Sequence, residues 1–293
     1  MSNDMRMKCV VAVDVGGTTM KGGLVRDGTV LHAESRPTPR ADGPEAVIAA
    51  ISAFVSDLAA PRGGLRPTAV GLAVPGLVTP THAVFSAAIG WRDVPAAAFA
   101  DVPLPVTLGH DVRAAGAAEL AYGAARDEPN VLFLPIGTGI AGAMALDGAL
   151  YGGASGWAGQ IGHIPVHPDG LPCGCGQRGC LAAYASAAAI AARCGETSAA
   201  AVLARTDAVA RQVWQEAVAA LALALATYTL LLDPAIIVIG GGLAQAGEAL
   251  VAPLRAGLAG RLAFRHPPRV EVSALGPRAG LLGAALLAAR ATT

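Results

Sequence analysis

The sequence predicts an α/β protein, built from two domains with a cleft between them. Predicted strands alternate with predicted helices along the chain, which is typical of α/β proteins. A unit of strand, glycine turn and strand occurs twice, which suggests an internal duplication. The chain has 293 residues, of which 54% are hydrophobic and 14% are charged, so it can bury a substantial core.

The first half opens with a hairpin-like segment. A β-branched run ends in Asp14, and residues 20–25 and 29–35 follow as strands around a tight Asp27-Gly28 turn. Residues 43–60 carry apolar side chains at helical spacing and predict an amphipathic helix. The next predicted elements are a buried strand at 68–78, broken by Pro75-Gly76, and a strand at 105–111 leading into a helix at 112–125.

The second half repeats the opening pattern. Residues 130–153 again predict strands separated by a glycine turn and an Asp147-Gly148 turn. Helices follow a cysteine-rich stretch, and then come an apolar helix at 217–232, a strand from residue 235 and a final helix at 279–290.

Charge and hydropathy narrow the class of function. The formal net charge is zero, so no basic footprint for nucleic acid is present. Residues 217–232 are too short and too rich in alanine for a membrane span, and they predict a buried core helix. Because the first ten residues lack the apolar segment of a signal peptide, we expect a cytoplasmic protein with reduced thiols and a small-molecule site.

Three glycine clusters could bind a nucleotide. The first contains Gly16, Gly17, Thr18, Thr19 and Lys21, whose backbone, hydroxyls and charge suit a phosphate. The second contains Gly137, Thr138 and Gly139, and the third contains Gly241 and Gly242, where the adenosine part could lie. None is a Walker A or Rossmann sequence, and each alone could be an ordinary turn. Their combination favours nucleotide binding.

The stretch from His167 to Cys180 holds three of the five cysteines. Cys173, Cys175 and Cys180, with His163 as the fourth ligand, predict a closed tetrahedral site that suits structural Zn²⁺. A closed site leaves no open position for water. Cys9 and Cys194 are interpreted as ordinary buried thiols.

Asp111 lies where a predicted strand passes into a helix, a frequent place for active-site groups. Aspartate is also a favoured N-cap residue, so its position has a purely structural explanation. Both roles can coexist if the carboxylate faces the cleft.

Together these motifs resemble the ROK family (repressor, open reading frame, sugar kinase) of the actin-like ATPase superfamily. Residues 13–25 resemble its first phosphate motif, residues 136–163 its second phosphate segment and sugar motif, residues 162–186 its zinc signature, and residues 236–244 its adenosine motif. The resemblance covers nearly the whole chain in the expected order.

The resemblance implies a two-lobed actin-like (ribonuclease H-like) fold. Residues 1–108 with 279–293 would form the small lobe, and residues 109–278 the large lobe with the zinc loop. It also implies that ATP and Mg²⁺ are used to phosphorylate a hydroxymethyl oxygen, with Asp111 as the base. Asp14 and the glycine clusters would bind phosphates and metal. His163 could bind zinc through one ring nitrogen and substrate through the other. Family members commonly form dimers or tetramers, so we expect a homo-oligomer.

The sugar-contacting positions depart from the family pattern. Where the family has two asparagines around Asp111, this chain has His110 and Arg113. Two glutamates of the family are replaced by Gln160 and Ala182, and an asparagine is replaced by Ala88. Gly76 is kept as a substrate-contact position. Losing these acceptors removes discrimination for ordinary hexose hydroxyls. We therefore hypothesise a kinase for an amino sugar, a deoxy sugar or a cyclitol. A glucokinase with substitute contacts and a non-catalytic sugar sensor are the alternatives. Arg113 either binds phosphate or only extends along its helix.

Overall fold

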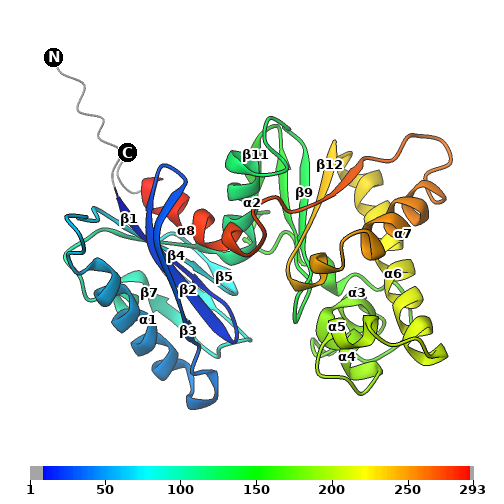
Figure 1. Ribbon diagram of the computed structural model, residues 1–293, viewed down its shortest axis with the longest axis horizontal. Coiled ribbons are helices and arrows are strands. Elements are labelled where there is room, and N and C mark those ends of the chain that lie inside the picture. The colour runs from blue at the N-terminus through cyan, green and yellow to red at the C-terminus, as the bar shows by residue number, and fades with distance from the viewer. Residues whose placement is uncertain (1–8, 291–293) are drawn as a thin grey trace. The chain divides into compact units, whose positions relative to one another are not determined.

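The computed structural model describes residues 9–290, whose contacts divide into two compact units (Figure 1). Unit 1 holds residues 9–118 and 277–290, and unit 2 holds residues 119–276. The lobe boundaries expected after residue 108 and before residue 279 stay a prediction.

Unit 1 is built on a five-stranded sheet in the order β3-β2-β1-β4-β8. The first three strands are antiparallel, and β4 and β8 run parallel to β1. Its elements are β1 (Val10–Val15), β2 (Thr19–Arg26), β3 (Thr29–Pro37), η1 (Arg40–Asp42), α1 (Pro44–Ala59), β4 (Val70–Val74), β5 (Leu77–Val78), β6 (His82–Phe85), β7 (Arg92–Pro95), η2 (Ala96–Phe99), β8 (Val106–His110), the first part of α2 (Asp111–Tyr122) and α8 (Ala279–Arg290).

The two faces of this sheet carry side chains of different size. Val11, Val13 and Leu72 form a core with α1, as expected for an amphipathic helix on a sheet. The other face is lined with small residues, and α8 packs so closely that a Cβ on Gly71 would come within 3.0 Å of Ala284. The small residues therefore set the close approach of α8.

Unit 2 repeats this topology, with strand order β11-β10-β9-β12-β13 and the same alternation of antiparallel and parallel pairs. This agrees with the suggested duplication. Its elements are the end of α2, β9 (Val131–Pro135), β10 (Ala143–Leu146), β11 (Ala149–Tyr151), η3 (Ile161–His163), α3 (Leu181–Ala185), α4 (Ala187–Arg193), α5 (Ala199–Leu203), α6 (Ala208–Leu232), β12 (Ile236–Gly240), η4 (Gly242–Ala246), α7 (Glu248–Ala259) and β13 (Arg269–Val272), with η5 (Gly276–Arg278) at its end.

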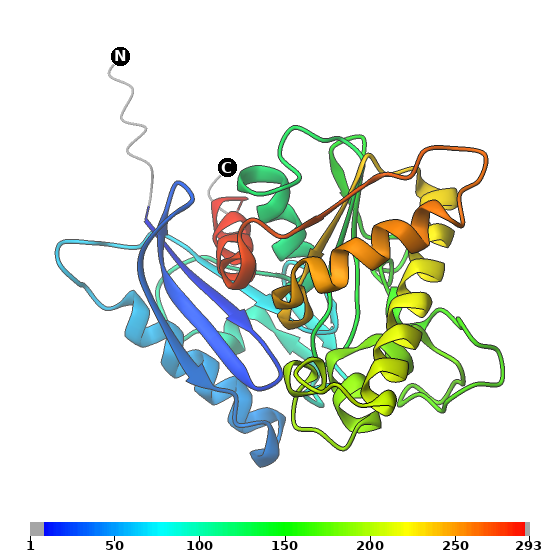
Figure 2. The ribbon, with the colours of Figure 1, turned by 45° about the vertical axis from the view of Figure 1, so that its right-hand side comes forward.

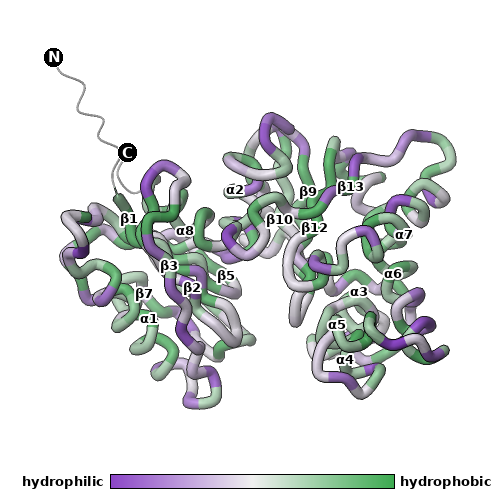
Figure 3. Tube along the Cα trace, viewed as in Figure 1, coloured by the Kyte–Doolittle hydropathy of each residue, from purple (hydrophilic) through white to green (hydrophobic). Residues whose placement is uncertain are grey.

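Helix α6 contains the apolar segment predicted at 217–232. By length and composition it could cross a membrane, with a mean hydropathy of 1.6. Its residues Leu221 and Leu225 are fully buried in the core of unit 2, and α7 lies alongside it (Figure 2). The hydropathy-coloured trace shows apolar stretches along α6 and the strands β9 and β12 (Figure 3). Because these leucines are part of the core of unit 2, α6 is a core helix, as predicted.

Most predicted elements are confirmed, including both Asp-Gly turns, in which Asp27 and Asp147 adopt positive φ. The interpretation of Cys194 is wrong, because this thiol is only half-buried, whereas Cys9 is buried as predicted.

Candidate functional site

Unit 1 brings Asp14, Lys21 and Asp111 into one electrostatic cluster. Asp14 is near the end of β1 and is the register partner of Lys21 on β2. Lys21 Nζ donates to the carbonyl of Pro277 at 3.3 Å, just before α8. The turn between β1 and β2 is closed by a 3.1 Å hydrogen bond from the Gly16 amide to the Thr19 carbonyl, and Thr18 and Thr19 are exposed on it.

The Asp14 carboxylate lies against Gly280 in the first turn of α8, where any Cβ would come closer than 3.0 Å to its oxygen. Burial and, to a smaller extent, the charge of Asp111 raise the pKa of Asp14 against the opposing charge of Lys21, and the resulting pKa is about 7. Lys21 therefore compensates the negative charge of the Asp14 carboxylate only in part. Gly280 was missed from the sequence, although a glycine inside a helix is a recognisable sign of close packing.

Asp111 is the first residue of α2, directly after β8. Its Oδ1 accepts the Val112 amide at 2.7 Å, yet 28% of its side chain stays exposed. The structural and the functional interpretation of Asp111 thus coexist, since one oxygen orients the carboxylate while the group keeps access to solvent. An oriented, accessible carboxylate is what a general base requires.

His110 caps α2, a role that the sequence did not reveal. The Arg113 amide approaches His110 Nδ1 at 3.4 Å, so the hydrogen-bond network assigns the imidazole proton to Nε2. His110 is buried, and this burial lowers its pKa despite the nearby charge of Asp111, while Arg113 lowers it further. The imidazole is therefore neutral at neutral pH. Burial also lowers the pKa of Arg113, and Asp111 partly restores it.

Unit 2 brings together the second and third glycine clusters. The Ile136 amide donates to the Gly240 carbonyl at 3.0 Å, and the Leu243 amide donates to the Ile136 carbonyl at 3.0 Å. Gly241 has a φ of 75°, and a Cβ there would collide with Ile136. A Cβ at four further positions would meet no atom within 4 Å, so packing does not require glycine there; these are Gly17, Gly137, Gly139 and Gly242. Bare backbone facing open space suits the approach of an anion.

The predicted metal ligands converge. The ligand atoms of His163, Cys173, Cys175 and Cys180 all lie within 4.8 Å of one another. Cys173 Sγ is 3.8 Å from His163 Nδ1, and Cys175 Sγ is 3.7 Å from Cys180 Sγ. Tetrahedral Zn²⁺ with Zn–S bonds of about 2.3 Å requires edges of about 3.8 Å. The four residues fit Zn²⁺, and Nδ1 is the nitrogen placed for it.

The predicted substrate residues are distributed over both units. Ala88 and Gln160 are exposed, while Gly76 and Ala182 are half-buried. Gly76 is held by its turn, since its φ is 110° and a Cβ would meet the Phe85 carbonyl.

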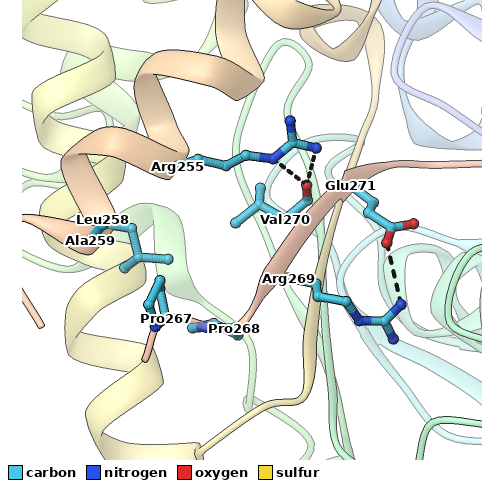
Figure 4. A pocket seen from close by; sticks show the side chains of 8 residues that line it. All are labelled: Arg255, Leu258, Ala259, Pro267, Pro268, Arg269, Val270 and Glu271. Carbon is cyan, nitrogen blue, oxygen red and sulfur yellow. Dashed lines mark hydrogen bonds and ion pairs between the residues drawn. The ribbon is translucent and has the colours of Figure 1, made fainter. Parts of the chain in front are cut away.

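Two hollows lie in unit 2. One, of about 430 Å³, is lined by Gly242, Leu243, Gln245 and residues of α4 and α5, beside the third glycine cluster. The other, of about 450 Å³, lies between α7 and β13 (Figure 4). There Arg255 donates to the Val270 carbonyl and Arg269 pairs with Glu271, so neither guanidinium is poised for a ligand.

Comparison with known proteins identifies the family of this chain. The sequence model described as the ROK family matches residues 10–291. The chain belongs to the ROK family. This ROK protein is 32% identical to the glucokinase of Streptomyces coelicolor, with 96% of this chain and 98% of the relative covered. It is 33% identical to the N-acetylmannosamine kinase of Escherichia fergusonii, over 95% and 97% of the two chains.

A solved structure shows the shared fold of this ROK protein. The ROK family glucokinase from Streptomyces griseus, in complex with glucose and AMPPNP, gives a TM-score of 0.84 at 31% identity, covering 96% of this chain and 99% of that one. The fold is therefore the actin-like ATPase fold of ROK sugar kinases, as expected.

Proposed function

We propose that this protein is an ATP-dependent kinase that transfers the γ-phosphoryl group to the hydroxymethyl oxygen of a hexose-like acceptor. The observation that carries the proposal is the carboxylate pair of unit 1. Asp14 is desolvated and has a raised pKa, whereas Asp111 is oriented by the Val112 amide and remains accessible. Two carboxylates in such different surroundings suit two different roles.

Asp14 suits a cation. Its burial and the charge of Asp111 leave it short of positive charge, and a divalent cation would compensate both. Mg²⁺ is held in proteins by one or two carboxylates together with substrate phosphates, whose charge it neutralises when bound. The glycine-rich turns at 16–19 and 137–139 would bind the phosphates of ATP, and Gly241 with Gly242 would border the adenosine.

Asp111 would accept the proton of the attacking hydroxyl while the oxygen forms its bond to the γ-phosphorus and the bond to ADP breaks. In such a loose transition state, most of the acceleration comes from positioning and from charge stabilisation. His110 contributes by capping α2, which fixes the backbone at Asp111. Because its imidazole is neutral, with the proton on Nε2, this Nε2–H would donate a hydrogen bond to a hydroxyl of the sugar-like substrate.

The cysteine cluster would hold structural Zn²⁺ and shape the acceptor side of unit 2. With Nδ1 of His163 directed to the metal, its Nε2 is left to contact substrate. Metal analysis of the purified protein should find about one zinc per chain.

For the acceptor, we propose an amino sugar, a deoxy sugar or a cyclitol. The side chains of Ala88 and Ala182 make no hydrogen bond. Gln160 offers an amide, which binds a hydroxyl less strongly than a carboxylate at this position would. Sites that pair buried polar groups with hydroxyls reject analogues that lack them, and this discrimination is weakened here. The named glucokinase relatives favour plain glucose as the second candidate.

The test is ATP consumption by zinc-replete protein against a panel of hexoses, amino sugars and cyclitols. Asp111→Asn should lower kcat by about 10²- to 10⁴-fold, the usual contribution of a general base. Asp147→Asn is the matched control, because Asp147 is exposed in a turn with a φ of 50°, which asparagine tolerates.

Strong turnover of one modified acceptor, with little turnover of glucose, would support the proposal. Efficient glucose turnover would make the protein a glucokinase. Tight ATP binding without turnover of any acceptor would reject a kinase and favour a sugar sensor.

We also propose a cytoplasmic homo-oligomer, a dimer or tetramer, with no nucleic-acid or membrane partner. Light scattering after size-exclusion chromatography tests the oligomeric state.

A further inference from the structure

A buried carboxylate in α2 has no part in the proposed reaction. Glu119 is 0% exposed, and it lies eight residues after Asp111 on the same helix. Its carboxylate accepts hydrogen bonds from the Leu275 amide at 3.1 Å, from the Ala124 amide at 2.8 Å and from the Ser273 hydroxyl. Burying a charge is costly, so these three donors must compensate for lost hydration.

The position of Glu119 in the chain is unusual. The chain passes from unit 1 to unit 2 between Ala118 and Glu119, and it returns between Gly276 and Pro277. The carboxylate at the first crossing thus binds the residues that precede the second crossing by two to four positions. We call Glu119, Ala124, Ser273 and Leu275 the Glu119 clasp.

The residues next to the Glu119 clasp allow its hydrogen bonds to form. Gly123 lacks a side chain where a Cβ would come within 3.0 Å of Glu119 Oε2, so glycine lets the carboxylate fold back to the Ala124 amide. On the other side, the Gly276 amide donates to Ser273 Oγ at 2.8 Å. The Ser273 amide donates to the Ile239 carbonyl at 2.8 Å, which anchors the clasp to the end of β12.

Both segments that leave the clasp carry groups of the candidate site. Towards its N-terminus, α2 leads back to Asp111. Beyond the second crossing, the Pro277 carbonyl accepts from Lys21, and Gly280 packs on the Asp14 carboxylate. Within unit 1, these two segments touch again, because a Cβ on Gly283 would collide with the Ala114 carbonyl.

We propose that Glu119 is a positioning residue that ties the two chain crossings to each other and so fixes where Asp111 and Asp14 stand relative to each other. This inference rests on the proposed kinase function. A carboxylate is needed because three donors point at it, and an ionised carboxylate only accepts. In Glu119→Gln, the amide NH₂ would face at least one of these donors.

Glu119→Gln tests the proposal, with Glu216→Gln as the matched control. Glu216 lies on α6 in the same unit, and its carboxylate binds Arg193 and Gln212, away from both crossings. With the fastest acceptor of the panel, Glu119→Gln should lower kcat at least about 10-fold while KM for ATP changes less than about 2-fold. Misplaced reacting groups produce such a loss. Glu216→Gln should leave kcat within about 2-fold, at a comparable loss in Tm.

Hydrogen exchange measured without any ligand gives the second readout. In Glu119→Gln, exchange should accelerate in the peptide covering residues 119–126 or in the one covering residues 271–277, because either the Ala124 amide or the Leu275 amide loses its acceptor oxygen, while β1 and β9 keep their protection. Unchanged exchange at both crossings overturns the clasp. Unchanged kcat, or an equal loss in both variants, overturns the positioning role.

The two readouts separate this inference from the proposed function. A wild-type protein without activity on any acceptor, combined with accelerated exchange, would reject the kinase and with it the positioning role, but not the clasp. An active wild-type protein whose crossings exchange normally in Glu119→Gln would reject the clasp alone.

Discussion

Asp14→Asn should make the protein more stable at alkaline pH while abolishing its activity. Asparagine keeps the shape of the side chain beside Gly280 and removes the charge that burial and Asp111 oppose. Loss of the carboxylate also removes the expected Mg²⁺ ligand, so phosphoryl transfer should fall by orders of magnitude. Stability and activity are thus expected to move in opposite directions.

The magnitude follows from the pKa of Asp14, which is raised from 3.8 to about 7 in the folded protein. At 1.36 kcal/mol per pKa unit, the charged form is disfavoured by about 4 kcal/mol. The folded protein therefore binds a proton that the unfolded chain does not bind between the two pKa values. Stability from this group is present at acidic pH and is lost as pH rises through about 7. Between pH 8 and pH 5 the wild type should gain about 2.5 kcal/mol from Asp14.

The assay is urea unfolding between pH 5 and pH 8.5 in magnesium-free, nucleotide-free buffer. Trp91 is buried in unit 1 with its ring edge-on to Phe99 at 5.3 Å, so its fluorescence reports this unit. A background with Trp157→Phe and Trp214→Phe, which removes the other two tryptophans, isolates the signal. The difference between wild type and Asp14→Asn cancels the titration of other groups.

Parallel stability curves for the two proteins, within about 0.5 kcal/mol over this pH range, would refute the reasoning. Asp111→Asn gives an internal check. It should reduce the wild-type slope without removing it, because burial, which remains, is the larger cause of the raised pKa.

Three further substitutions test the packing of the site. Gly280→Ala should lower kcat about 100-fold, because its Cβ displaces the Asp14 carboxylate. Tm should change little, because alanine favours the helix. Steady-state kinetics measures kcat, and calorimetry measures Tm. Cys175→Ser should abolish stoichiometric zinc in metal analysis and raise KM for the acceptor about 10-fold or more, since His163 loses its fixed ring. Gly241→Ala should weaken ATP binding and lower Tm, as calorimetry would show, because its Cβ collides with Ile136.

Local signals in the sequence were sufficient for much of the fold. A β-branched run and the Asp27-Gly28 and Asp147-Gly148 turns predicted the hairpins, helical spacing predicted α1, and an apolar, alanine-rich run predicted the buried part of α6. The elements without such signals were not predicted. The strands β6 and β7 are four residues long, and β13 alternates charged residues with valine. Pairing with β12 defines β13, whereas β6 and β7 are defined by pairing within the small antiparallel sheet β5-β6-β7.

The sequence by itself determined which chemical groups are present and their spacing, as for the four ligands around Cys175 and for Asp111 between a strand and a helix. These features depend on neighbours within a few residues. The tertiary structure decided the rest: that Asp14 is desolvated against Gly280, and that Glu119 binds Leu275 across more than one hundred and fifty residues. Desolvation and charge act through space and need the folded packing, so no local pattern encodes them.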